Sequence, residues 1–106
     1  MGVSNPVLQD NAKKASKFLK VVANENRLII LCALAEGEKN VGELEEILEI
    51  RQPTLSQQLS RLRNENLVRT RRDSKQIYYR IASDEAIELI GLMYDLFCSE
   101  DESDLS

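Results

Sequence analysis

Hydrophobic residues recur at helical spacing along most of the chain and predict four helices before the pattern changes. The first helix is expected to start at Asn5-Pro6, a capping residue followed by a first-turn proline. Its apolar stripe contains Leu8, Ala12, Ala15, Leu19 and Val22. The second helix, capped by Asn24 and ended by Gly37, is apolar on nearly all sides and includes Cys32 and Ala35. We therefore expect it to be the buried centre of the fold.

Two short amphipathic helices follow. Asn40 is the expected cap of the third, whose inward-facing residues are Val41, Leu44, Ile47 and Leu48. Pro53 is expected to begin the fourth, which continues to about Glu65. Its inner line consists of Leu55, Leu59 and Leu62. Two short helices joined by a tight turn are typical of a helix-turn-helix.

The hydrophobic period then changes to two. Residues 67–72 and 76–81 are β-rich runs separated by Asp73-Ser74-Lys75, which predicts a hairpin with Ile77, Tyr79 and Ile81 on one face. Ser83-Asp84 open a last helix that runs to about Cys98, and about the last eight residues are expected to be a flexible acidic tail. The order α-α-α-α-β-β-α over residues 1–106 predicts a single, mainly α domain with a β-hairpin wing, a winged helix-turn-helix.

The charge of the chain has to be divided by segment before it is informative. The whole chain has 14 Lys+Arg and 18 Asp+Glu, a net charge of −4, which by itself argues against a nucleic-acid partner. Residues 51–80, however, contain eight basic and two acidic residues, a net of +6, whereas residues 84–106 contain eight acidic residues and no basic one. Because the positive segment coincides with the fourth helix and the hairpin, it favours DNA binding by these elements.

Polar side chains lie off the leucine line of the fourth helix and suit contacts with DNA. The candidate residues are Gln52, Thr54, Ser56, Gln57, Gln58, Ser60 and Arg61 on the helix, and Arg71, Arg72 and Lys75 on the hairpin. Gln pairs bidentately with adenine, and Ser or Thr reaches either base in the major groove. Arg61, with Arg51 and Arg63, is better suited to phosphates. The hairpin cations are expected to enter a minor groove or to hold the DNA backbone.

The segment from Arg27 to Ile81 resembles the ArsR/SmtB family of bacterial winged-helix repressors. The residues that carry this resemblance are LSQQLSRLR on the fourth helix, the following NLV, and the hairpin RRDSKQIYYRI. The resemblance implies that a homodimer, joined through the first and last helices, binds a palindromic double-stranded operator. The implied interface residues are Leu8, Ala12, Ala15, Leu19, Ile90, Met93 and Phe97. The apolar character of the last helix supports a partner chain independently.

Some positions depart from the pattern of this family. Gln58 stands where members usually have His, and Arg51 where many have Ser. These two departures leave the operator sequence open. The chain has no His, and the third helix has no thiol, so the metal sites common in the family are not expected, and neither is a cofactor.

The two cysteines, Cys32 and Cys98, occupy the places used by the thiol-switch subgroup of the family, typified by SqrR, BigR and HlyU. This resemblance implies that reactive sulfur species or oxidants join them by a disulfide or polysulfide bridge and so release the operator. The sequence shows no thiolate activator. Cys98 lies near the negative end of its helix beside acidic residues, and Cys32 lies in an apolar helix.

Several alternatives stay open. The chain can instead be an anti-repressor or constitutive regulator with structural cysteines, a metal-responsive repressor using carboxylates of the last helix, or a winged module that binds protein. An enzyme is not expected, since the sequence has no His, no Gly-rich phosphate loop and no carboxylate pair in a predicted cleft. The longest apolar run, Leu28 to Ala35, is far short of the roughly 20 residues of a membrane span, so we expect a cytoplasmic protein without a membrane partner.

Overall fold

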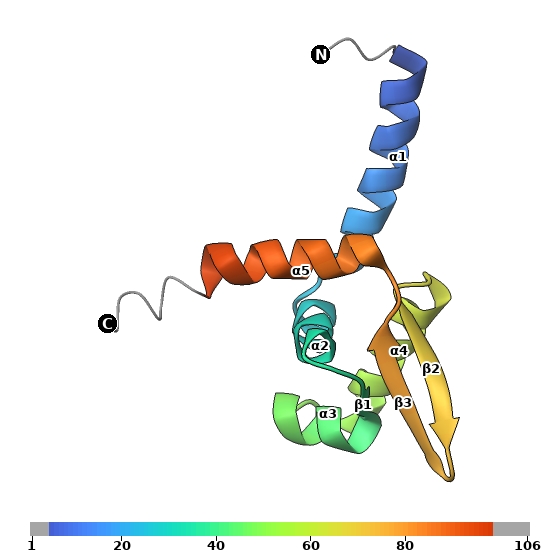
Figure 1. Ribbon diagram of the computed structural model, residues 1–106, viewed down its shortest axis with the longest axis vertical. Helices are drawn as coiled ribbons and strands as arrows, with labels where there is room; N and C mark the ends of the chain where they lie inside the picture. The colour runs from blue at the N-terminus through green and yellow to red at the C-terminus, as the bar shows by residue number, and fades with distance from the viewer. Residues whose placement is uncertain (1–4, 99–106) are drawn as a thin grey trace.

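The computed structural model describes residues 5–98 and confirms the predicted winged helix-turn-helix. Its helices are α1 (Asn5–Val22), α2 (Glu25–Ala35), α3 (Val41–Leu48), α4 (Gln52–Asn64) and α5 (Asp84–Phe97), and its strands are β1 (Lys39–Asn40), β2 (Val68–Asp73) and β3 (Gln76–Ile81). Helix α5 lies across α2, α1 projects from the body, and the tip of the β2–β3 hairpin points away from α5 (Figure 1). The predicted acidic tail lies outside the described residues.

Helix α2 forms the centre of the molecule, as its apolar sequence predicts. It packs against α1, α3, α4, α5 and β3, and Ile30, Leu31 and Leu34 are buried within the core. The expectation of burial on all sides is wrong for one side of the helix. Cys32 and Ala35 are exposed because this side faces an open groove beside α5 rather than a packed element.

Helices α3 and α4 pack on α2 through narrow apolar lines. In α4, Leu55, Leu59 and Leu62 are all fully buried. The helix begins at Gln52 rather than Pro53, because the proline has no N–H and is tolerated within the first turn. In α3, Leu44 is buried, but Ile47 is 54% exposed, contrary to the prediction. The line of α3 that meets the core has the spacing i, i+3 and i+7 from Val41, and Ile47 lies to one side of it.

The wing is part of a three-stranded antiparallel sheet with the order β1-β3-β2. The hairpin has the register Val68↔Ile81 to Asp73↔Gln76, which confirms the predicted pairing of the two runs. Strand β1 was not expected, since two residues are too short to show an alternating pattern. Ile81 is buried at the base of the wing, whereas Ile77 is 44% exposed because the hairpin extends beyond the core towards its tip.

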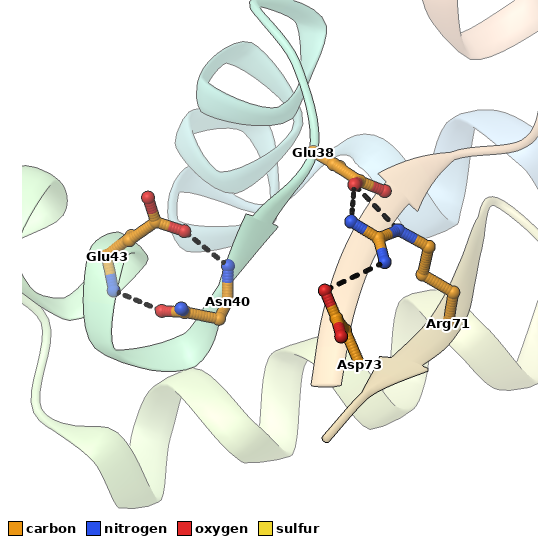
Figure 2. A network of polar contacts seen from close by, with 5 residues as sticks. All are labelled: Glu38, Asn40, Glu43, Arg71 and Asp73. Carbon is orange, nitrogen blue, oxygen red and sulfur yellow. Dashed lines mark hydrogen bonds and ion pairs between the residues drawn. The ribbon is translucent and has the colours of Figure 1, made fainter. Parts of the chain in front are cut away.

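Asn40 joins the sheet to α3 through a reciprocal capping box (Figure 2). Its Oδ1 accepts a hydrogen bond from the N–H of Glu43 at 2.8 Å, and Oε1 of Glu43 accepts one from the N–H of Asn40 at 2.9 Å. The caps predicted for α2 and α5 are also present: Asn24 accepts from Arg27 N–H at 3.0 Å, and Ser83 from Ala86 N–H at 3.1 Å. These caps set where each helix begins.

Removal of the α3 cap gives a direct test of this local structure. We expect Asn40→Ala to lower the free energy of unfolding by about 1 kcal/mol, the usual loss for an N-cap. Urea unfolding measures this change. The control is Asn11→Ala on the exposed surface of α1, which is expected to stay within about 0.5 kcal/mol of the parent. Equal effects of the two substitutions would contradict a role of Asn40 as a cap.

Candidate nucleic-acid interface and cysteine pair

The outer face of α4 gathers the polar side chains that the sequence analysis assigned to DNA. Gln52, Ser56, Gln57, Ser60 and Arg61 are exposed, and Thr54 and Gln58 are partly buried. The buried leucines occupy the opposite side of the same helix, so the polar residues share one surface. Arg51 and Arg63 are also exposed. This face can therefore offer neutral hydrogen-bonding groups together with positive charge, the combination that bases and phosphates require.

Gln58 differs from its neighbours on α4 because it is bonded to Arg27 of α2. Nη1 of Arg27 donates to Oε1 of Gln58 at 2.8 Å, and Nε of Arg27 donates to the carbonyl oxygen of Val21. A bidentate contact with adenine uses both amide atoms of a Gln side chain. Because Oε1 is occupied here, Gln58 has its amide nitrogen left for DNA.

Arg27 is a residue at this surface that the sequence analysis missed. Its side chain is partly buried and connects α2 to α4 and to the end of α1. One signal in the sequence pointed to it. Arg27 is a cation in the first turn of an apolar helix, where the positive end of the helix dipole disfavours a cation that has no other partner.

In the wing, Arg71 is engaged within the protein (Figure 2). Its Nε donates to Oε1 of Glu38 at 2.7 Å, Nη2 donates to the same oxygen, and Nη1 lies 3.7 Å from Oδ2 of Asp73. The guanidinium also lies 4.7 Å from the ring centroid of Tyr78. The hydrogen bond between the two side chains lowers the pKa of Glu38 and raises the pKa of Arg71. Arg71 therefore ties the hairpin to the segment before β1.

The other two wing cations are differently placed. Arg72 and Lys75 are exposed, and neither makes an ion pair with any of residues 5–98. Lys75 lies in the turn at the tip of the hairpin, next to Ser74, which adopts a positive φ of 59°. Of the three predicted wing contacts, Arg72 and Lys75 thus present their charge to solvent without a carboxylate partner.

The two cysteines are free thiols at the contact of α2 with α5. Cys32 lines an open groove of about 470 Å³. The other lining residues are Ala35 and Glu36 of the α2 end and Ile87, Ile90, Gly91, Tyr94 and Asp95 of α5. Cys98 follows one turn after Tyr94, to whose carbonyl oxygen its N–H donates at 2.8 Å. Cys98 therefore continues the side of α5 that lines the groove.

The surroundings of Cys32 oppose its ionisation. Desolvation by the groove walls, then the negative charges of Cys98 and Glu36, raise the pKa of Cys32. The electrostatic effect of Cys98 on Cys32 also shows that the two thiols share one neighbourhood. All three causes act in the same direction, so Cys32 stays protonated at neutral pH more fully than a free cysteine does. This agrees with the lack of a thiolate activator in the sequence.

Helices α1 and α5 expose most of the residues predicted for a dimer interface. Leu8 is 56%, Leu19 50% and Phe97 69% exposed; Ala12 and Ala15 are also exposed, and Met93 is partly buried. The prediction for Ile90 is corrected, because this side chain is only 4% exposed and belongs to the core of its own protomer. The exposed apolar side chains of α5 also include Ile87, Leu92 and Leu96.

The described residues were also searched for metal ligands and membrane spans. Within residues 5–98, no three Cys, His, Asp or Glu side chains gather as a set of metal ligands. In the same part of the chain, no helix has the length and apolar character needed to cross a membrane.

Comparison with known proteins identifies the family. The profile of the family described as bacterial regulatory protein, arsR family, matches residues 24–70. The chain is 49% identical over 98 residues to the biofilm growth-associated repressor of Agrobacterium fabrum, covering 92% of this chain and 84% of the relative. It is 41% identical over 95 residues to the transcriptional activator HlyU of Vibrio cholerae, covering 90% of this chain and 88% of the relative.

A solved structure agrees with these relatives. The structure of reduced HlyU from Vibrio cholerae superposes with a TM-score of 0.82 at 43% identity, covering 86% of this chain and 96% of that chain. Sequence and fold thus lead to the same family, and the resemblance inferred from the recognition helix and wing is confirmed. The chain belongs to the ArsR family of bacterial regulatory proteins.

Proposed function

We propose that the chain is a homodimeric transcriptional repressor that binds palindromic operator DNA through α4 and the wing and releases it when Cys32 and Cys98 are bridged. The polar outer face of α4 beside a wing with two unpaired cations is the observation that carries the DNA-binding part. Helix α4 would enter the major groove, and Arg72 and Lys75 would hold the adjacent backbone or minor groove.

The exposed apolar faces of α1 and α5 support the dimer. Helix α1 projects from the body (Figure 1), and Leu8 and Leu19 on it are half exposed. At the far end of α5, Phe97 is 69% exposed. Apolar patches of this kind on a small protein mark contact surfaces, and a second copy of the chain would cover both helices. Two copies would present their α4 helices to half-sites about 34 Å apart.

The cysteine groove supports the proposed switch. A disulfide forms when the two thiols together lose two protons and two electrons to an oxidant; with a persulfide, one or more sulfur atoms remain between them. The groove is open at Gly91, where an added Cβ would meet nothing within 4 Å. A small sulfur species or oxidant therefore has access to Cys32. A bridge would fasten α2 to α5, and through α5 it would change the spacing of the two recognition helices.

A second candidate function is that of an anti-repressor, which displaces another repressor from DNA. The observation in its favour is that the Vibrio relative is called an activator, whereas the Agrobacterium relative is called a repressor. A reporter gene fused to a bound promoter separates the two. Deletion of the regulator raises expression if it is a repressor and lowers expression if it is an anti-repressor.

The central prediction concerns reduced and bridged protein. DNA selected for binding from a random-sequence pool is expected to bind the reduced protein with an affinity that falls steeply as salt rises. After treatment with a persulfide donor, we expect an affinity about 5- to 150-fold weaker, the usual range for coupled sites. Intact mass measures the bridge in the same samples.

Cysteine variants provide the control for this experiment. Cys32→Ser and Cys98→Ser each remove one end of the bridge, so both variants are expected to keep full affinity after the same treatment. Bridged parent protein with undiminished affinity would contradict the switch. A reduced parent protein that binds no DNA would contradict the proposed function as a whole.

The rate of Cys32 modification should depend on pH and on Glu36. Because burial and negative charges raise the pKa of Cys32, its alkylation in a Cys98→Ser background is expected to accelerate as pH rises above neutrality. Glu36→Gln removes one of the charges that raise this pKa, so it should speed alkylation at pH 7. Glu46→Gln, on the exposed side of α3, is the matched control and should leave the rate unchanged. Identical rates in the two variants would rule out an effect of Glu36.

A further inference from the structure

A second groove lies at the junction of α2 with α4, apart from the cysteines. It has a volume of about 340 Å³ and is lined by Arg27, Gln57, Gln58, Ser60, Arg61 and Asn64. All of these side chains are polar or positively charged, and none is acidic. A surface hollow of this composition suits an anion better than a cation or an apolar ligand.

Arg27 is held in place at this groove by neutral partners only. Its two side-chain hydrogen bonds go to the carbonyl oxygen of Val21 and to Oε1 of Gln58. A guanidinium has five N–H donors, so these bonds leave donors for a ligand. Among the described residues, Arg27 forms no ion pair, and its positive charge is therefore not neutralised within the protein.

Arg61 brings a second positive charge to the same groove. Partial burial, and then the charge of Arg61, lower the pKa of Arg27, which shows that the two guanidinium groups repel each other. The carboxylate paired with Arg61 is Glu65, one turn later on α4, at 3.9 Å and with the Arg61 side chain 53% exposed. An exposed pair at this distance contributes little. An anion between Arg27 and Arg61 would relieve their repulsion.

We propose that Arg27 and Arg61 together hold one backbone phosphate of DNA, so that α2 contributes a contact from outside the recognition helix. The inference rests on the proposed DNA-binding function. The groove opens on the surface of α4 that carries the predicted base contacts, which makes a phosphodiester the nearest available anion. Arginine donors suit phosphate oxygens, and Gln57 and Ser60 supply neutral donors beside them. Arg27 would thereby position α4 on the duplex without reading sequence.

The test measures how the affinity for a random-sequence duplex depends on salt. The variants are Arg27→Gln, Arg61→Gln and the double variant, with Lys13→Gln on exposed α1 as the matched control. Loss of one phosphate contact lowers the slope of log affinity against log salt by about 0.9. A fourfold rise in salt should therefore weaken the parent about 3-fold more than either single variant. Because both arginines hold the same phosphate, the double variant should lose no more slope than a single one.

Several results would overturn this assignment. Folded single variants with the slope of the parent, or a double variant with about twice the loss, would exclude a shared phosphate. If Arg27→Gln does not fold, Arg27→Lys replaces it: this variant keeps the charge but loses the fork of donors, so it should bind more weakly at every salt concentration, and unchanged binding would exclude the contact.

Free phosphate is the second probe, because it shares the chemistry of the DNA backbone. If inorganic phosphate raises the unfolding temperature of the parent but not of Arg61→Gln, while the duplex slopes stay equal, the site takes a free oxyanion and the DNA assignment is wrong. A parent that binds no duplex at all would instead overturn the proposed function. Failure of the inference and failure of that function are therefore distinguishable.

Discussion

The burial of helix α2 is the constraint on which the other elements depend. It contacts α1, α3, α4, α5 and β3, and it contributes Ile30, Leu31 and Leu34 to the core. The recognition helix α4 is placed by the leucines that it packs into this core. The same rigid helix carries Arg27 in its first turn and Cys32 in its last, so one element connects the DNA-facing groove to the thiol groove.

Charge is distributed over the protein so that its net value conceals the functional surface. The net charge of −4 includes a segment of +6 that forms α4 and the wing. Not every cation of this segment is open to DNA, since Glu38 and Asp73 both pair with Arg71. The unpaired cations Arg72 and Lys75, together with the Arg27 and Arg61 groove, are therefore the groups from which the salt dependence of binding is expected to arise.

Much of the fold follows from local sequence signals, and the differences arise where tertiary packing decides. Caps at Asn24, Asn40 and Ser83 and the leucines of α4 are local features, which the sequence shows directly. Strand β1 exists because Lys39 and Asn40 meet the edge of β3, a long-range contact without a local pattern. Periodicity marks Ile90 as apolar, but only packing shows that it faces α2 rather than a partner. The pairings of Arg71 with Glu38 and of Arg27 with Gln58 likewise join residues more than thirty positions apart.

The central claim is that bridging of Cys32 to Cys98 and binding of DNA exclude each other energetically. Such coupling is reciprocal, so DNA must disfavour the bridge by the same factor by which the bridge weakens DNA binding. The most direct measurement is the fraction of Cys32–Cys98 disulfide at equilibrium in a glutathione redox buffer, with and without saturating DNA. Coupling predicts that DNA shifts this equilibrium towards the free thiols by about 5- to 150-fold. The same disulfide fraction with and without DNA would contradict it.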